Sequence, residues 1–446
     1  MVPKDSFLLA DAETMVAVFP FLTNYDPPGT SEGALDPLGL YQIADQLAVK
    51  LVPAVRERMQ RVRFLTAMAV GALVTEGLED DPKQRDASPY LVWEWLVVEA
   101  LIRKMTDDPA LWGVPGTLMA RRALEQHGYL DARSYLKTPR IFGFHGVYKR
   151  LAVHLGITDV HLGPGPNAEP LVDAWARDLG LAGIEDAKSK MSRWSAAVRR
   201  SLGEKPPRTK TGWNSEAWAE LAHAFAPSAC KSREKRFLHD LLHSTDGRRL
   251  GAFPAIWKLQ QEFDDDGYGD EGLHNRLEKE EPSYGPLLAA IRAYEAFARS
   301  LQDSFDVLKA AAAGLDAEGF AVPRIASDQD FKYCQKDLCR QYDNAHHALA
   351  EVSLSDMSLQ NLFDERFGAF SQPMDTAELA LKLCAHHEAV QRAKSADGKR
   401  PWFDRIGPDR IYIRHAYREP RHVIQPGCYV HDYRGKPIRR FHSDLS

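Results

Sequence analysis

Apolar residues recur at alternating steps of four and three through one stretch of the chain, and this period constrains the fold more than any other feature. The positions are Leu287, Ile291, Tyr294, Ala298, Leu301, Phe305 and Leu308. A 3.5-residue period over three heptads predicts a long helix with one apolar stripe, which must pack against another helix. That partner is either a helix of the same chain or, in an intermolecular coiled coil, a helix of another chain.

Helix signals dominate most of the remaining sequence. Ser88-Pro89 is typical of a helix start, and Asp375-Thr376-Ala377-Glu378 has the spacing of a capping box. Near the end the period changes, since Arg410–Arg414 alternates like a strand and Cys428–His431 is a second candidate strand. We therefore predict a mainly α fold, a multidomain helical bundle with a small C-terminal β element.

The chain has 446 residues, enough for two to four domains of roughly 100 to 200 residues. We predict an irregular N-terminal arm over 1–35, a helical domain over 36–202, a helical domain with the long heptad helix over 213–325, and a helical plus β domain with a basic surface over 326–446. The intervening segment 203–212 is polar, basic and proline-containing, as linkers often are. Within the first domain, 140–181 fits either a winged helix or an ordinary helical connection.

Composition points to a reducing compartment. Five cysteines are few and odd in number, which argues against a disulfide framework. The N-terminus lacks the order of charge, apolar body and cleavage site of a signal peptide, and no run approaches the ~18 apolar residues of a membrane span. We expect a cytoplasmic protein without membrane contact. Phosphate-loop, dinucleotide, H-E-x-x-H and G-x-S-x-G motifs are absent from the sequence, so we expect no cofactor.

The charge is unevenly distributed. The segment from Lys399 to Ser446 holds eleven Lys/Arg and five Asp/Glu, whereas the whole chain has a net charge of -5. Its basic and aromatic candidates for binding nucleic acid are Arg410, Arg414, Arg418, Arg421, Arg434, Lys436, Arg439, Arg440, Tyr429 and Tyr433. Positive groups neutralise phosphates and aromatic rings stack on bases. The same segment also suits docking on an acidic partner or on the protein's own acidic body, or a solvated surface.

Cysteine and histidine gather in sequence at Cys334 and Cys339, with Cys384 and His387 further on. Thiolates and imidazoles are zinc ligands. However, Cys334 and Cys339 lie five positions apart on one expected helix and so point about 140° apart. We therefore expect no metal and interpret these side chains as part of a helix–helix contact.

Arg340 precedes His346 late in the helical region, and this spacing resembles the motif of the HEPN ribonucleases. The resemblance implies that Arg340 and His346 act on the RNA backbone without a metal, in two copies that meet across a dimer. Such roles suit an imidazole that exchanges protons near neutral pH and a guanidinium that holds phosphate. An Arg followed by a His after four to six intervening residues also occurs at Arg233–His239 and Arg236–His243, so chance also explains the pattern.

Three stretches resemble uncharacterised helical proteins of bacterial antiphage defence islands. They are Leu35–Leu40, Arg61–Leu65 and Gly143–Tyr148. The resemblance implies an accessory or nucleic-acid-sensing subunit and no catalytic residues. From the sequence we predict a non-enzymatic subunit that binds nucleic acid and other protein subunits. The alternatives are a HEPN-like metal-independent ribonuclease and a scaffold that binds protein only.

Overall fold

The computed structural model divides into two compact units, and each is built from two separate parts of the chain. Unit 1 comprises Met1–Leu47 and Ser283–His431, and unit 2 comprises Ala48–Pro282 and Asp432–Ser446. The residues that the structure describes are 36–78, 87–105, 109–111, 113–136, 139–228, 230–244, 250–262, 269–313, 320–325, 327–352, 358–394, 398–405, 410–418, 422–425 and 427–446. The N-terminal arm predicted over 1–35 lies outside them.

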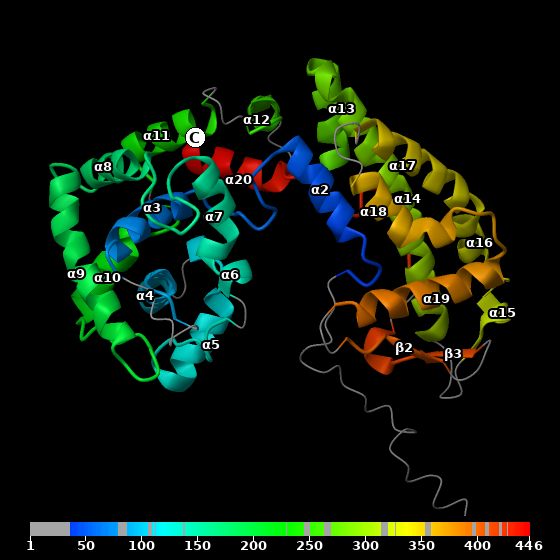
Figure 1. Ribbon diagram of the computed structural model, residues 1–446, viewed down its shortest axis with the longest axis horizontal. Helices are drawn as coiled ribbons and strands as arrows, with labels where there is room; N and C mark the ends of the chain where they lie inside the picture. Colours follow the sequence, from blue (N-terminus) through cyan, green and yellow to red (C-terminus); the bar gives the residue numbers. More distant parts are fainter. Residues whose placement is uncertain are drawn as a thin grey trace, which may run out of the picture. The chain divides into compact units, whose positions relative to one another are not determined.

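Unit 1 is a helical body with a small sheet. The division between the units passes through α2 (Tyr41–Leu51). The other elements of unit 1 are α14 (Gly285–Ala313), β1 (Phe320–Ala321), α15 (Val322–Ile325), α16 (Gln329–Lys336), α17 (Leu338–Val352), α18 (Ser358–Phe367), η4 (Gly368–Phe370), α19 (Thr376–Arg392), β2 (Phe403–Arg405), β3 (Arg410–Ile413) and η5 (His415–Tyr417). Figure 1 shows α14 among α16, α17, α18 and α19.

The long heptad helix is confirmed as α14. Its apolar stripe is fully buried at Ile291, Leu301 and Phe305, and it packs against α16 and α17 of the same chain. Because these intrachain helices cover the stripe, α14 has the intramolecular partner that was one of the two alternatives. The cap predicted for α19 is also present, since the Asp375 carboxylate accepts a hydrogen bond from the Glu378 N–H at 2.8 Å.

The mainly α fold and its small β element near the C-terminus are confirmed. β3 is the predicted strand, and it lies between β1 and β2 in an antiparallel sheet of order β1-β3-β2. Phe320 and Phe403 pair with Ile411 and Ile413 of β3, respectively. The burial of Ile411 and Ile413, two positions apart, places one side of β3 in the core.

The second strand, predicted over Cys428–His431, is wrong. The backbone of this segment bonds to side chains of α14 instead of to a neighbouring strand. Arg299 donates to the carbonyl oxygens of Cys428 and Tyr429 at 2.9 Å each. The N–H groups of Val430 and His431 donate to the Glu295 carboxylate. Side chains of α14 thus satisfy the backbone polar groups of this segment, which does not need a neighbouring strand. The alternating apolar and polar sequence therefore forms an irregular segment here.

Unit 2 is all α among its described residues. Its elements are α3 (Arg63–Thr75), α4 (Pro89–Met105), η2 (Pro109–Leu111), α5 (Thr117–His127), α6 (Pro139–Phe142), α7 (Phe144–His154), α8 (Ala168–Asp178), α9 (Ile184–Leu202), α10 (Ser215–Ala224), α11 (Ser232–Leu242), α12 (Phe253–Glu262), α13 (Asp270–Glu280) and α20 (Gly435–Leu445), with η3 (Pro282–Tyr284) at the boundary. Helix α4 starts at the predicted Ser88-Pro89 signal.

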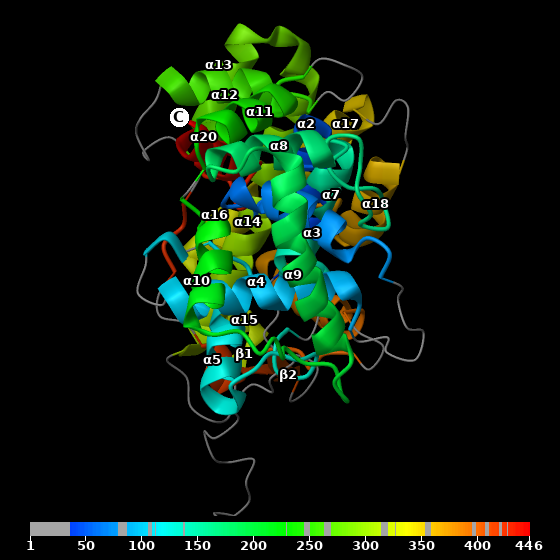
Figure 2. The same ribbon diagram turned by 90° about the vertical axis from the view of Figure 1, so that its left-hand side faces the viewer.

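The core of unit 2 is built on α3 and α4, which are apolar on nearly all sides and buried along almost their whole lengths. A helix that is hydrophobic all round must be enclosed by others. Helices α7, α8 and α9 pack on α3, and α5, α9 and α10 pack on α4 (Figures 1 and 2). The last helix, α20, packs on α11 and α12 and buries Ile438 and Phe441.

The segment predicted as a linker, 203–212, lies inside unit 2 and is fixed to it. Thr209 exchanges two hydrogen bonds with Leu130, at 2.8 and 2.9 Å, and both Thr209 and Thr211 are buried. In 140–181, α7 is joined to α8 by the loop over 155–167, which contains one isolated bridge between Thr158 and Pro164. No helix among the described residues is long and apolar enough to cross a membrane.

Candidate functional site

The two residues of the HEPN-like pattern both lie on α17 but bind different partners. Arg340 is exposed and pairs with Asp337 at 3.1 Å. The His346 ring is half-buried, with its Nε2 3.1 Å from the Asp364 carboxylate and 2.9 Å from the Gln360 amide. Arg340 and His346 therefore contact different carboxylates, and the ribonuclease role stays a prediction.

The cysteine and histidine candidates do not form a metal site. Among the described residues, no three side chains of His, Cys, Asp and Glu are grouped so as to hold an ion. Cys339 donates to the Ser371 carbonyl oxygen at 3.1 Å, while Cys334 and Cys384 are buried, and burial raises the pKa of each of these two thiols to about 12. Both nitrogens of His387 are also occupied by backbone groups.

The first part of the basic C-terminal segment belongs to unit 1, where its candidate residues range from buried to exposed. Arg414 is buried, with its guanidinium over the Tyr417 ring at 5.5 Å. Arg418 donates to the Ile413 carbonyl oxygen at 2.9 Å and lies over Tyr412. Tyr429 is half-buried, and Arg410 is exposed at the start of β3. Arg421 lies outside the described residues.

The second part of the segment belongs to unit 2. Tyr433 and Arg434 are buried, and the Tyr433 N–H donates to the Asp270 carboxylate. Lys436 is exposed but paired with Asp432 at 2.8 Å. Arg439 donates to the Gln260 side chain at 3.0 Å, and Arg440 is exposed. The candidates are thus divided between the two units, and three of them, Arg414, Tyr433 and Arg434, are buried. Their role in binding stays a prediction.

A different set of basic residues gathers on unit 2, and we call it the cationic face. It consists of Arg103, Lys104, Arg200, Lys205, Arg208 and Lys210. Hydrogen bonds tie these residues to neighbouring segments of unit 2. Arg103 donates to the Gly128 carbonyl oxygen at 2.8 Å, Lys104 donates to the Ser215 hydroxyl, and Arg200 donates to the Thr211 carbonyl oxygen.

Aromatic rings lie beneath two of these guanidinium groups. Arg103 stands over Trp218 at 5.3 Å, and Arg208 stands over Tyr129 at 4.9 Å. The Trp213 ring is half-buried and meets Trp218 edge to face at 4.9 Å. A guanidinium stacked on a ring keeps its N–H groups at the edge, where they remain able to bind an anion.

Two carboxylates, Glu204 and Glu99, form ion pairs with residues of this face. Glu204 pairs with Lys210 at 2.8 Å and Arg208 at 3.0 Å, and hydrogen bonds from these two groups lower its pKa. Glu99 is buried and pairs with Arg103 at 2.7 Å, although burial raises its pKa. Six basic groups therefore outnumber the two carboxylates they contact. The sequence signal for this face was the basic composition of 203–212, which we interpreted as a linker.

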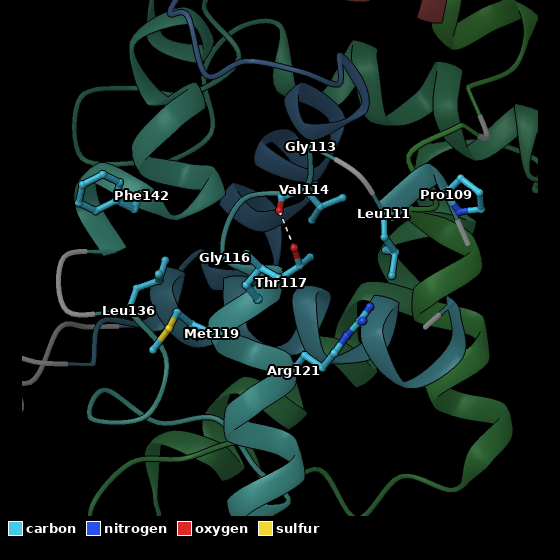
Figure 3. Close-up of a pocket in the computed structure, with 11 residues that line it drawn as sticks. Pro109, Leu111, Gly113, Val114, Gly116, Thr117, Met119, Arg121, Leu136 and Phe142 are labelled. Carbon is cyan, nitrogen blue, oxygen red and sulfur yellow. Dashed lines mark hydrogen bonds between the residues drawn. The ribbon is translucent and has the colours of Figure 1, made fainter. Parts of the chain in front are cut away.

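A pocket of about 680 Å³ surrounds the first turn of α5 in unit 2. Figure 3 shows Phe142, Leu136 and Met119 on one side of this turn and Leu111 and Arg121 on the other. The loop before the helix carries Gly113 and Gly116, each at φ +83°. A side chain on Gly113 would collide with Gln60, at 2.6 Å, so the glycine lets the loop approach Gln60 closely.

Behind the loop lies a buried polar network. A Cβ on Gly116 would collide with the hydroxyl of Tyr135, and this hydroxyl donates to Glu94 at 2.8 Å. Glu94 is fully buried and also accepts from the His145 N–H at 2.9 Å, with the His145 ring Nδ1 at 2.6 Å. The network joins α4 and α7 to the loop over 131–136 and fixes the floor of the pocket.

Comparisons with known proteins give no guide to either site. The sequence matches no protein-family model and no curated protein, and the structure matches no solved structure.

Proposed function

We propose that the protein binds nucleic acid through the cationic face of unit 2. The observation that carries this proposal is the gathering of six basic side chains from three segments, two of them stacked on aromatic rings. Phosphate neutralisation supplies most of the affinity of non-specific nucleic-acid binding, and rings beside the cations offer surfaces for bases. In this proposal the protein is a non-enzymatic subunit, and the resemblance noted above suggests a bacterial defence system as its setting.

The proposal moves the interface away from the C-terminal segment. Arg414 and Arg434 are each 1% exposed, so neither can meet a phosphate without unfolding its surroundings. In contrast, the side chains of Arg208 and Lys210 are 40% and 57% exposed. Their ion pairs with Glu204 are therefore solvated and weak, and a phosphate can replace the carboxylate at little cost.

The test measures binding of labelled single- and double-stranded DNA and RNA by fluorescence anisotropy at several salt concentrations. The variant is Arg208→Gln with Lys210→Gln, and the matched control is Arg177→Gln with Lys188→Gln, which removes two exposed cations elsewhere in unit 2. Loss of two phosphate contacts should weaken binding about tenfold or more and lower the slope of log affinity against log salt by roughly two.

A third variant, Arg439→Gln with Arg440→Gln, separates the two locations. Binding that falls for the Arg208/Lys210 variant and stays at the control level for Arg439/Arg440 supports the cationic face. Binding that falls only for Arg439/Arg440 assigns the interface to α20. If no nucleic acid binds at any salt concentration, the scaffold alternative takes the place of this proposal.

A further inference from the structure

The pocket around the first turn of α5 has the size and lining of a small-molecule site. Such sites enclose about 300 to 1,000 Å³ and are mostly apolar. Here the volume is about 680 Å³. Leu118, Met119 and Phe142 are 83%, 44% and 40% exposed. These exposed apolar side chains line one hollow, and a ligand bound there would remove their surface from water.

Arginine side chains stand on both sides of the pocket, and the carboxylate behind its floor, Glu94, is fully buried. Arg121 lines it on one side of α5, and on the other side the Arg58 guanidinium lies 4.6 Å from the centre of the Phe142 ring. Among the described residues that line the pocket, none is a carboxylate. An apolar ligand with a negative group would therefore meet complementary charge at either side, whereas a cationic ligand would be repelled.

The floor of the pocket is held in place before any ligand arrives. The Tyr135 hydroxyl bonds to the buried Glu94 carboxylate and leaves no room for a side chain on Gly116. The Thr117 hydroxyl donates to the Val114 carbonyl oxygen at 3.1 Å, which closes the loop onto the helix (Figure 3). Because the floor is already ordered, a ligand does not have to order it on binding. The entropy cost of binding is therefore smaller and the affinity higher.

We propose that this pocket binds a small amphipathic anion, an acyl or aryl acid. Its apolar part lies against Leu118, Met119 and Phe142, and its acidic group faces Arg121. This site is separate from the cationic face, because none of its described lining residues belongs to that face. The proposal does not depend on nucleic-acid binding.

The test uses the full chain and fluorescence of anilinonaphthalene sulfonate, an aryl anion, displaced by dodecanoate, dodecanol or dodecylammonium below their micelle concentrations. Dodecanoate should displace the dye at a concentration about tenfold lower than the other two. Arg121→Gln should abolish that difference, since a hydrogen bond to a charged group contributes enough for about a tenfold change in affinity. Arg177→Gln, an exposed arginine of α8, is the matched control.

Two substitutions at Leu118 test the location. Leu118→Gln removes apolar surface, and Leu118→Asp adds a charge that repels an anion while suiting the first turn of a helix, so the fold is preserved. Both should weaken dye and dodecanoate binding about fivefold or more, with Asp the weaker binder, because each loses apolar contact. Val160→Gln, at a side chain that is 61% exposed elsewhere in unit 2, should have no effect.

Binding that is unchanged in both Leu118 variants overturns the proposed location. Dodecylammonium or dodecanol that competes as well as dodecanoate overturns the anionic class of ligand. Absence of dye and dodecanoate binding overturns the proposal as a whole. Nucleic-acid binding measured on the same Leu118 variants should equal that of the unmodified protein, so failure here is distinguishable from failure of the proposed function.

Discussion

Acid should destabilise unit 1 through one histidine. The ring of His387 is fully buried among Phe305, Trp402 and Phe403, with ring centres 5.0 to 5.3 Å away. Its Nε2 accepts a hydrogen bond from the Trp402 N–H at 3.0 Å, so its Nδ1 carries the proton and donates to the Pro37 carbonyl oxygen at 3.0 Å. A second proton on Nε2 would point at the Trp402 N–H, and the charged ring would lie in an apolar site.

Burial accordingly lowers the pKa of His387 from 6.5 to about 3. Since the unfolded chain takes up the proton near pH 6.5 and the folded protein does not, stability is full above that pH and falls as the solution is acidified. The loss is about 1.4 kcal/mol for each pH unit below 6.5, or about 2 kcal/mol at pH 5. It approaches its limit, about 5 kcal/mol, near pH 3.

The assay is urea unfolding followed by circular dichroism between pH 7.5 and pH 5. His387→Gln has no titrating group but keeps one donor and one acceptor. The decrease in unfolding free energy between pH 7.5 and pH 5 should therefore be about 2 kcal/mol smaller in this variant than in the unmodified protein. His347→Gln, at an exposed histidine of unit 1, should leave the decrease unchanged. Equal pH dependence in His387→Gln and the unmodified protein would refute the reasoning.

Three further results are expected. Burial raises the pKa of Asp270 to about 6, so stability is lost as pH rises from about 4 to 6, and Asp270→Asn should stabilise the protein at pH 7.5 by up to about 3 kcal/mol in urea unfolding. Gly116→Ala should destabilise by about 2 kcal/mol or more because it displaces Tyr135, whereas Gly128→Ala, also at positive φ but facing open space, should cost about 1 kcal/mol. If the HEPN-like alternative holds, RNA cleavage in EDTA should disappear in His346→Ala; no cleavage by the unmodified protein removes that alternative.

Local signals in the sequence were sufficient to predict single helices. They did not show which charged residues are exposed. The period of α14 and the caps of α4 and α19 depend on neighbours within a few residues, and all three helices were predicted. Burial of a charged residue depends on distant partners. Arg434 reads as exposed in sequence, yet it lies beside Tyr433, which is held by Asp270 from another part of unit 2. Sequence alone does not contain that pairing.

The role of the cationic face also depends on distant partners, although none of its residues is buried. The basic segment 203–212 was visible, but its meaning changed once Thr209 was seen to bond to Leu130 and Arg103 was seen over Trp218. A polar, proline-containing stretch is typical of a linker when its neighbours are unknown. The pocket around α5 had no signal beyond glycines, because its shape depends on Tyr135 and Gln60 beneath the loop.

The alternation of the chain between the two units has a consequence for biosynthesis. Residues 48–282 of unit 2 are translated before most of unit 1, but α20 is translated only after all of unit 1. Until then, the apolar surface that Ile438 and Phe441 cover in the folded protein is exposed. The Arg61 side chain and the Val62 N–H also lack Asp444, which they bind in the folded protein. At roughly 5 to 20 residues per second, translation from 283 onward takes about 8 to 30 seconds. Unit 1 therefore completes its chain before unit 2 does, and nascent unit 2 presents an apolar surface to chaperones throughout that interval.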